Sequence, residues 1–118
     1  MSKYANAGEL RTAVYFKRIE RETDGEGFPV EREVNVFGED KYVLGKWVNA
    51  HGSEAFTAMQ LELREPATLT VRYSPLIKET LLVYKGNDSA PYEVISVDNV
   101  EERNAWLEIK VQRKVAAR

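Results

Sequence analysis

The chain has 118 residues, no cysteine, and 17 basic against 19 acidic side chains, which gives a formal net charge of −2. This length favours a single domain over residues 1–118 with a modest core. Without cysteine, the chain can form neither a disulfide framework nor a thiolate metal site. The near-neutral charge argues against stable binding to DNA or RNA, which normally requires excess lysine and arginine.

No run of the sequence is long and apolar enough for a membrane-spanning helix, and residues 1–6 lack the apolar stretch of a signal peptide. We therefore expect no membrane partner and a protein that is made and used in the cytoplasm.

Runs rich in valine, isoleucine, threonine and aromatic residues predict β-strands. These runs are residues 12–20, 41–49, 67–73, 80–85, 92–97 and 105–113, with 30–37 as a short edge piece. Alternation places Val14 and Phe16 on one face of the first run and Leu69, Val71 and Tyr73 on one face of the run 67–73, and it predicts that Leu107, Ile109 and Val111 face in. Gly45 in the middle of its run suggests close packing or a bulge.

The connections carry turn residues. Residues 21–40 contain Asp24-Gly25-Glu26-Gly27 and Phe28-Pro29, which predict a long mobile loop. Residues 86–91 separate two strand runs and predict a hairpin. The ends, residues 1–8 and 114–118, are expected to be flexible.

One stretch has a helical period: Phe56, Met59 and Leu63 are spaced i, i+3 and i+7, and Ser53 stands where an N-cap would. We therefore predict a helix over residues 53–63 that is marginal unless something covers its apolar stripe. Together, these elements predict a mainly β protein: a small antiparallel barrel or sandwich of about six strands with one short peripheral helix.

The sequence contains no convincing catalytic or metal site. His51 is the only histidine and lies in a polar turn, so we interpret it as a solvated loop residue. Asp98, Glu101 and Glu102 lack the spacing of a calcium loop. Ser53 has no nucleophile-elbow motif around it, so we expect no enzymatic activity, no metal and no cofactor.

Trp47 and Trp106 admit two interpretations. Tryptophan is enriched at the centres of binding patches, so both residues are candidate interface anchors, together with the outward Arg72. The two tryptophans are equally compatible with positions in the core. The sequence leaves this choice open.

Several motifs in order resemble the head-tail joining or head-closure proteins of long-tailed phages and prophages. The resemblance rests on the following segments: Gly8-Glu9-Leu10-Arg11 before the first strand, residues 42–48 followed by Gly52-Ser53-Glu54-Ala55-Phe56, Thr70-Val71-Arg72-Tyr73-Ser74-Pro75, and the closing runs 82–86, 92–97 and 106–111. It extends from about Gly8 to Arg113.

The resemblance implies a structural virion protein, assembled in the bacterial host cytoplasm, that forms a ring below the portal and adaptor. By family analogy the ring is a dodecamer that retains packaged DNA, lets it pass without specific binding and offers a surface to tail proteins. In relatives, the segment corresponding to residues 49–66 acts as a stopper. The candidate channel-gating residues are therefore Asn49, His51, Glu54, Phe56, Met59 and Gln60.

The charge of this segment fits a channel for DNA, because the segment supplies Glu54 and Glu62, no lysine, and Arg64 as its basic residue. Two alternatives remain open at this point. One is a tail-terminator or tail-completion ring, which would pair with tail tubes. The other is a β-barrel that binds a ligand or an oligonucleotide, for which Arg72, Lys110 and Trp106 are few outward residues.

Overall fold

The computed structural model describes residues 7–114. Its elements are a 3-10 turn η1 (Ala7–Glu9), the strands β1 (Thr12–Thr23), β2 (Pro29–Asn35), β3 (Val43–Asn49), β4 (Ala67–Arg72), β5 (Leu82–Lys85), β6 (Tyr92–Asn99) and β7 (Trp106–Arg113), the helix α1 (Gly52–Gln60), and a second 3-10 turn η2 (Val100–Glu102). The predicted flexible ends, residues 1–8 and 114–118, lie largely outside this range.

Six of the strands close into an antiparallel barrel. Their order is β1-β3-β4-β7-β6-β5, and the pairing of β5 back to β1 completes the circle. The prediction of a mainly β barrel with one short helix is confirmed. Closure removes the unpaired strand edges that an open sheet of this size would expose.

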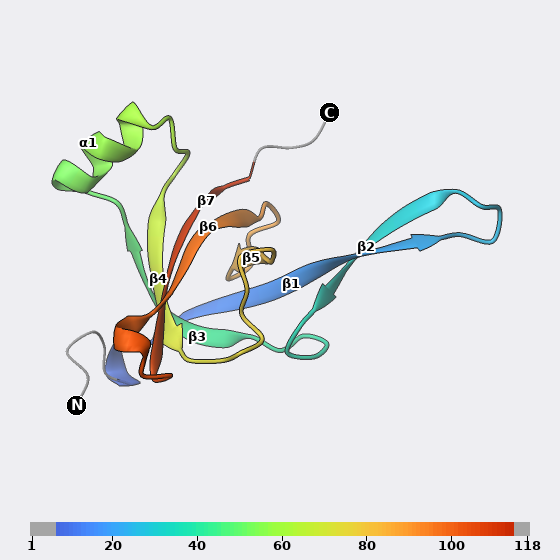
Figure 1. Cartoon of the computed structure of the whole chain (residues 1–118), viewed down its shortest axis with the longest axis horizontal. Coiled ribbons are helices and arrows are strands. Elements are labelled where there is room, and N and C mark those ends of the chain that lie inside the picture. Colours follow the sequence, from blue (N-terminus) through green and yellow to red (C-terminus); the bar gives the residue numbers. More distant parts are fainter. Residues whose placement is uncertain (1–6, 115–118) are drawn as a thin grey trace.

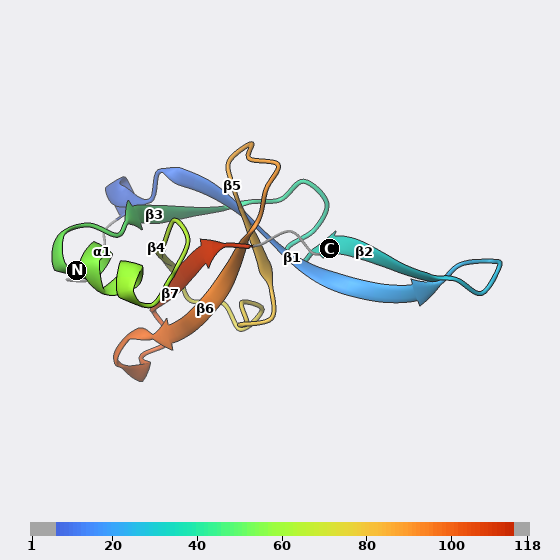
Figure 2. The same ribbon diagram turned by 90° about the horizontal axis from the view of Figure 1, so that it is seen from above.

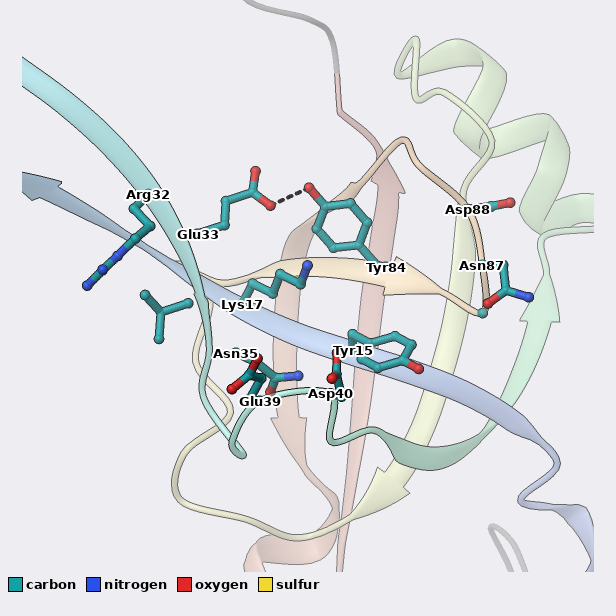
Figure 3. Close-up of a pocket in the computed structure, with 12 residues that line it drawn as sticks. Tyr15, Lys17, Arg32, Glu33, Asn35, Glu39, Asp40, Tyr84, Asn87 and Asp88 are labelled. Carbon is teal, nitrogen blue, oxygen red and sulfur yellow. Dashed lines mark hydrogen bonds between the residues drawn. The ribbon is translucent and has the colours of Figure 1, made fainter.

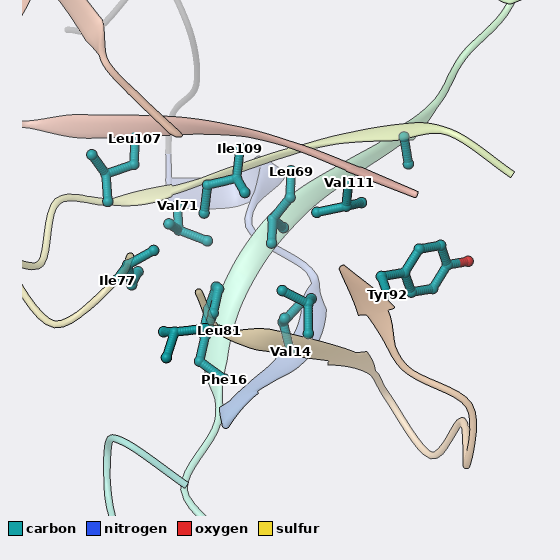
Figure 4. Packing of buried hydrophobic residues seen from close by; sticks show 12 residues of the cluster. Val14, Phe16, Leu69, Val71, Ile77, Leu81, Tyr92, Leu107, Ile109 and Val111 are labelled. Atoms are coloured by element: carbon teal, nitrogen blue, oxygen red, sulfur yellow. The ribbon is translucent and has the colours of Figure 1, made fainter. Parts of the chain in front are cut away.

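The barrel interior is filled by alternate side chains, as the period of the strands requires. Figure 4 shows these side chains converging from facing strands. The fully buried ones lie on the faces that alternation grouped in β1, β4 and β7, joined by Val83 from β5: Val14, Phe16, Leu69, Val71, Val83, Ile109 and Val111. Gly45 is buried, and a side chain would not fit there, since a Cβ atom would lie 2.5 Å from Leu69 Cδ1 and 2.9 Å from Val71 Cγ1. The close-packing alternative for Gly45 is therefore the correct one. The register shift in the described strands falls in β6, between Val94 and Ser96.

The loop predicted over residues 21–40 is wrong for much of its length. β1 continues to Thr23 and pairs with β2 over the register Lys17↔Asn35 to Thr23↔Pro29. The two strands form a hairpin that projects from the barrel, hereafter called the arm (residues 18–34; Figure 1). The hairpin predicted at residues 86–91 is correct, since this turn joins the paired strands β5 and β6.

Ion pairs across the two strands stabilise the arm in place of a hydrophobic core. Arg32 lies 3.0 Å from Glu20 and 3.1 Å from Glu22, and Arg21 lies 2.9 Å from Glu31. Hydrogen bonds from Arg18 and Arg32 lower the pKa of Glu20 below its ordinary value. Opposite charges on facing positions of two strands favour their pairing. A search for hydrophobic alternation therefore overlooks this hairpin.

Candidate functional site

Three regions carry the residues with candidate functions: the segment around α1, the outer face of β4 and β7, and the concavity where the arm meets the barrel. Figures 1 and 2 show α1 and the tip of the arm at opposite ends of the molecule. The molecule measures 53 Å along its longest axis against 32 and 26 Å along the others.

The helix α1 is three residues shorter at its C-terminal end than predicted, and its N-cap is His51 rather than Ser53. His51 has an extended backbone and makes no side-chain cap, whereas its Nδ1 lies 3.2 Å from the carbonyl oxygen of Asn49. Among the described residues, one ion pair joins the helix to the barrel, between Glu54 and Lys110 at 3.5 Å. It is therefore held mainly at its ends.

The apolar side chains of α1 are exposed. Phe56 is 60% exposed, Met59 is 76% exposed, and Leu61 just after the helix is similarly open. Gln60, the last residue of the helix, is also exposed. A nine-residue helix is marginal in water without packing on its apolar face. This geometry agrees with the expectation that the segment requires a partner surface.

Both ends of the segment are fixed to the barrel. At its start, Trp47 Nε1 donates to Asn49 Oδ1 at 3.0 Å, and the amide of Ala50 donates to the carbonyl oxygen of Pro66 at 3.0 Å. At its end, the amide of Arg113 donates to the carbonyl oxygen of Arg64 at 2.8 Å. The segment is therefore a flap with a firm base and an uncovered middle.

A cluster of aromatic rings and cations supports that base. The rings of Trp47 and Tyr92 pack edge to face with centroids 4.8 Å apart, and Lys85 Nζ lies 5.0 Å from the centroid of the Trp47 ring. Burial of Tyr92 raises the pKa of its hydroxyl. Trp47 thus packs against the core, as one of its two interpretations required.

The outer face of the barrel carries the other two candidate interface residues. Arg72 and Trp106 face each other across β4 and β7, with the guanidinium 5.4 Å from the ring centroid. Trp47 belongs to β3, which pairs with the other edge of β4, and its cross-strand partner is the buried Leu69. The structure therefore brings Arg72 and Trp106 together and separates Trp47 from them.

The concavity at the base of the arm, shown in Figure 3, has a volume of about 730 Å³ and is lined by residues of β1, β2 and β5. Tyr84 Oη donates to Glu33 Oε1 at 2.5 Å, and Lys17 Nζ lies 4.6 Å from the centroid of the Tyr84 ring. Burial and the bond to Glu33 raise the pKa of Tyr84 to about 12. These contacts link β2 to the barrel and set the direction of the arm.

The described residues contain no group of three or more histidine or acidic side chains placed to hold a metal ion. Over the same residues, no helix has the length and hydropathy to cross a membrane.

The edge piece predicted at residues 30–37 is confirmed as β2 (Pro29–Asn35), but the sequence prediction missed the continuation of β1 to Thr23, the base concavity and the bond between Tyr84 and Glu33. Asp24-Gly25 is a hairpin turn signal that could have revealed the arm, since charged residues of alternating sign stand on both sides of it, Glu20-Arg21-Glu22 before and Glu31-Arg32-Glu33 after. The bond of Tyr84 to Glu33 joins residues far apart in the sequence, so no local pattern indicates it.

Comparisons with known proteins agree with this architecture. The solution structure of protein SF1141 from Shigella flexneri 2a superimposes with a TM-score of 0.66 and 18% identity, covering 96% of this chain and 100% of that one. At this identity the match concerns the fold alone. No curated protein matches the chain. The family model of the phage head completion protein matches residues 5–114.

That match spans nearly the whole chain, including every strand of the barrel, the arm and α1. The family consists of structural proteins of the virion, which agrees with the head-closure resemblance and with the β-barrel fold. The chain belongs to the phage head completion protein family.

Proposed function

We propose that copies of this chain form a ring beneath the portal and adaptor of a filled phage head, where the segment 49–66 retains the packaged DNA and the outer surface receives tail proteins. The observation that carries the proposal is α1, a short helix with Phe56 and Met59 exposed, held at both ends but uncovered. In a ring, equivalent helices from neighbouring copies would cover these side chains.

The firm base of the segment supports a role under load. DNA pressing on α1 would transmit force through Asn49 and Arg64 into β3 and β7, which are paired along their length within the barrel. Among the described side chains, the ion pair that joins the helix to the barrel is that between Glu54 and Lys110, which is exposed, so α1 can change its position without disturbing the core.

The charge of the segment suits a channel wall. Glu62 is exposed, and Glu65 is occupied by Arg113. Carboxylates that face a channel repel phosphate and do not form counterion-releasing contacts with it. The purified protein should therefore release duplex DNA at physiological salt, and retention at about 10 µM protein, a typical range for non-specific binders, would contradict a passive channel.

DNA retention in filled heads that lack this protein tests the proposal. Added wild-type protein should protect the DNA from leakage and nuclease, and the variant F56S/M59S should bind heads while protecting the DNA much less. The matched control is Leu76→Ser, another exposed apolar side chain outside the segment. If wild-type protein left heads open but capped isolated tail tubes, the tail-terminator function would replace the proposed one.

A further inference from the structure

The tip of the arm, residues 22–30, is an ordered turn that presents an exposed aromatic side chain. Asp24 Oδ1 accepts hydrogen bonds from the amides of Glu26 and Phe28, each at 2.9 Å, and the amide of Asp24 donates to the carbonyl oxygen of Phe28 at 2.8 Å. This turn presents the Phe28 ring, which is 62% exposed. An ordered turn with an exposed aromatic ring can bind without a large ordering cost.

The tip also has unpaired acidic charge. Glu22 and Glu31 are paired with Arg32 and Arg21. Within the described part of the chain, the carboxylates of Asp24 and Glu26 have no cation within ion-pair distance. The tip therefore offers an exposed aromatic ring and the carboxylate of Glu26, while the carboxylate of Asp24, which also has no cation beside it, accepts the two amide hydrogen bonds of the turn.

A surface of complementary character lies on the side of the barrel. An open concavity of about 670 Å³ is lined by Lys41, Tyr42, Leu44 and Arg72, and by one acidic residue, Asp40, so its cations outnumber its carboxylates by two to one. Tyr42 and Leu44 are 54% and 47% exposed, and the Tyr42 ring packs edge-on against Tyr15 at 6.0 Å. This concavity is called the barrel socket below.

The cations of the barrel socket are free as well. Among the described residues, neither Lys41 nor Arg72 forms an ion pair, and Arg72 lies over Trp106 with its charge exposed. By contrast, the concavity at the base of the arm contains an excess of acidic side chains, so it would repel the tip. Charge therefore favours the barrel socket as the receptor for the tip.

The arm cannot reach the barrel socket of its own chain. Val14 of β1 pairs with Val43 beside the barrel socket, whereas Thr23 lies nine residues further along the same strand. At about 3.3 Å per residue, the tip lies roughly 30 Å from that pairing. A second copy must supply the barrel socket.

We propose that the tip of the arm, through the Phe28 ring and the carboxylate of Glu26, binds the barrel socket of a neighbouring copy between Lys41 and Arg72. The contact joins two different surfaces, so it repeats head to tail and generates a ring when the rotation between copies closes. This inference rests on the proposed function, because it supplies the contact that builds the proposed ring.

Because the chain has no cysteine, engineered cysteine pairs report this contact directly. Heads assembled with the double variant F28C/L44C should give a ladder of disulfide-linked oligomers on mild oxidation. The single variants and the control pair F28C/L76C should not. Leu76 is a suitable control because it is an exposed leucine outside the barrel socket.

A charge exchange provides a second test. Glu26→Arg or Arg72→Glu alone should reduce incorporation into heads about tenfold, and the double variant E26R/R72E should restore it, since opposite charges across an interface determine partner choice. Circular dichroism verifies that each variant is folded.

The outcomes separate the two proposals. Multimers in heads without the disulfide ladder would overturn the contact between the tip and the barrel socket and leave the proposed function standing. Heads that contain only unlinked single copies, together with failed DNA retention by the wild type, would overturn both.

Discussion

The guanidinium of Arg113 lies 4.1 Å from the centroid of the Tyr92 ring and at the same time binds the carboxylate of Glu65, with Nε donating to Oε2 at 3.1 Å. A further bond from Arg113 Nη1 reaches the carbonyl oxygen of Ala90 at 2.9 Å. One side chain thus joins the end of the α1 segment, the turn between β5 and β6, and the barrel. Its hydrogen bond to Glu65 raises the pKa of Arg113, so the guanidinium stays charged.

Replacing Arg113 should therefore loosen the base of the α1 segment. We expect Arg113→Ala to lower the free energy of unfolding by about 1–2 kcal/mol, since it removes charge-assisted hydrogen bonds and the stacking on Tyr92. Denaturant unfolding measures the loss. The control is Arg103→Ala, an exposed arginine after η2, and equal losses for both variants would contradict the role of Arg113.

Gly45 offers a sharp test of the barrel packing. Gly45→Ala would place a Cβ atom within 3 Å of the Leu69 and Val71 side chains, so we expect a loss of about 1–3 kcal/mol from overpacking. The matched control is Gly25→Ala in the turn of the arm, where a Cβ atom meets nothing within 4 Å. A stable Gly45→Ala variant would show that β3 does not pack against β4 as described.

The barrel illustrates what the sequence predicts well. Alternation placed Phe16, Leu69 and Ile109 inside because half-buried strands impose a period of two on apolar residues. The arm was missed because Arg21, Glu31 and Arg32 replace apolar residues there with cross-strand ion pairs, which hydrophobic alternation does not detect.

Only part of the candidate site could be predicted from the sequence, for a related reason. The exposure of Phe56 and Met59 followed from the short length of the helix and its single apolar stripe. The barrel socket depends on Tyr42, just before β3, lying near Arg72 of β4, and the direct pairing of β3 with β4 across the intervening α1 segment brings them together. Such long-range pairing has no local sequence signal.

The burial of Tyr84, together with its bond to Glu33, predicts a loss of stability at alkaline pH. The pKa of Tyr84 rises from 10.0 to about 12 on folding, so the folded state holds this proton more tightly than the unfolded chain. The resulting stabilisation is complete below pH of about 10 and is lost as the pH rises through about 12.

Unfolding curves across this alkaline range test the effect. The decline should be smaller in Tyr84→Phe, which has no hydroxyl to titrate, and ultraviolet absorbance should show one late-titrating tyrosine fewer. Tyr42→Phe is the control because Tyr42 is exposed. An unchanged decline in Tyr84→Phe would contradict the contribution of this bond.

The uncovered helix predicts a difference between the free and assembled protein. In a verified monomer, amides across residues 55–61 should exchange rapidly, because a nine-residue helix with one described ion pair to the barrel opens readily. In connectors the same amides should be protected, with β7 protected in both states as the internal control. Strong protection of residues 55–61 in the monomer would contradict coupled ordering.

Electron cryo-microscopy of the connector in intact virions locates this chain relative to the portal and the packaged DNA. We expect a ring of this chain directly beneath the portal and adaptor, with Phe56 and Met59 of neighbouring copies meeting at the channel axis against the end of the packaged DNA. A ring found only at the end of the tail tube, or single copies bound outside the channel, would contradict this expectation.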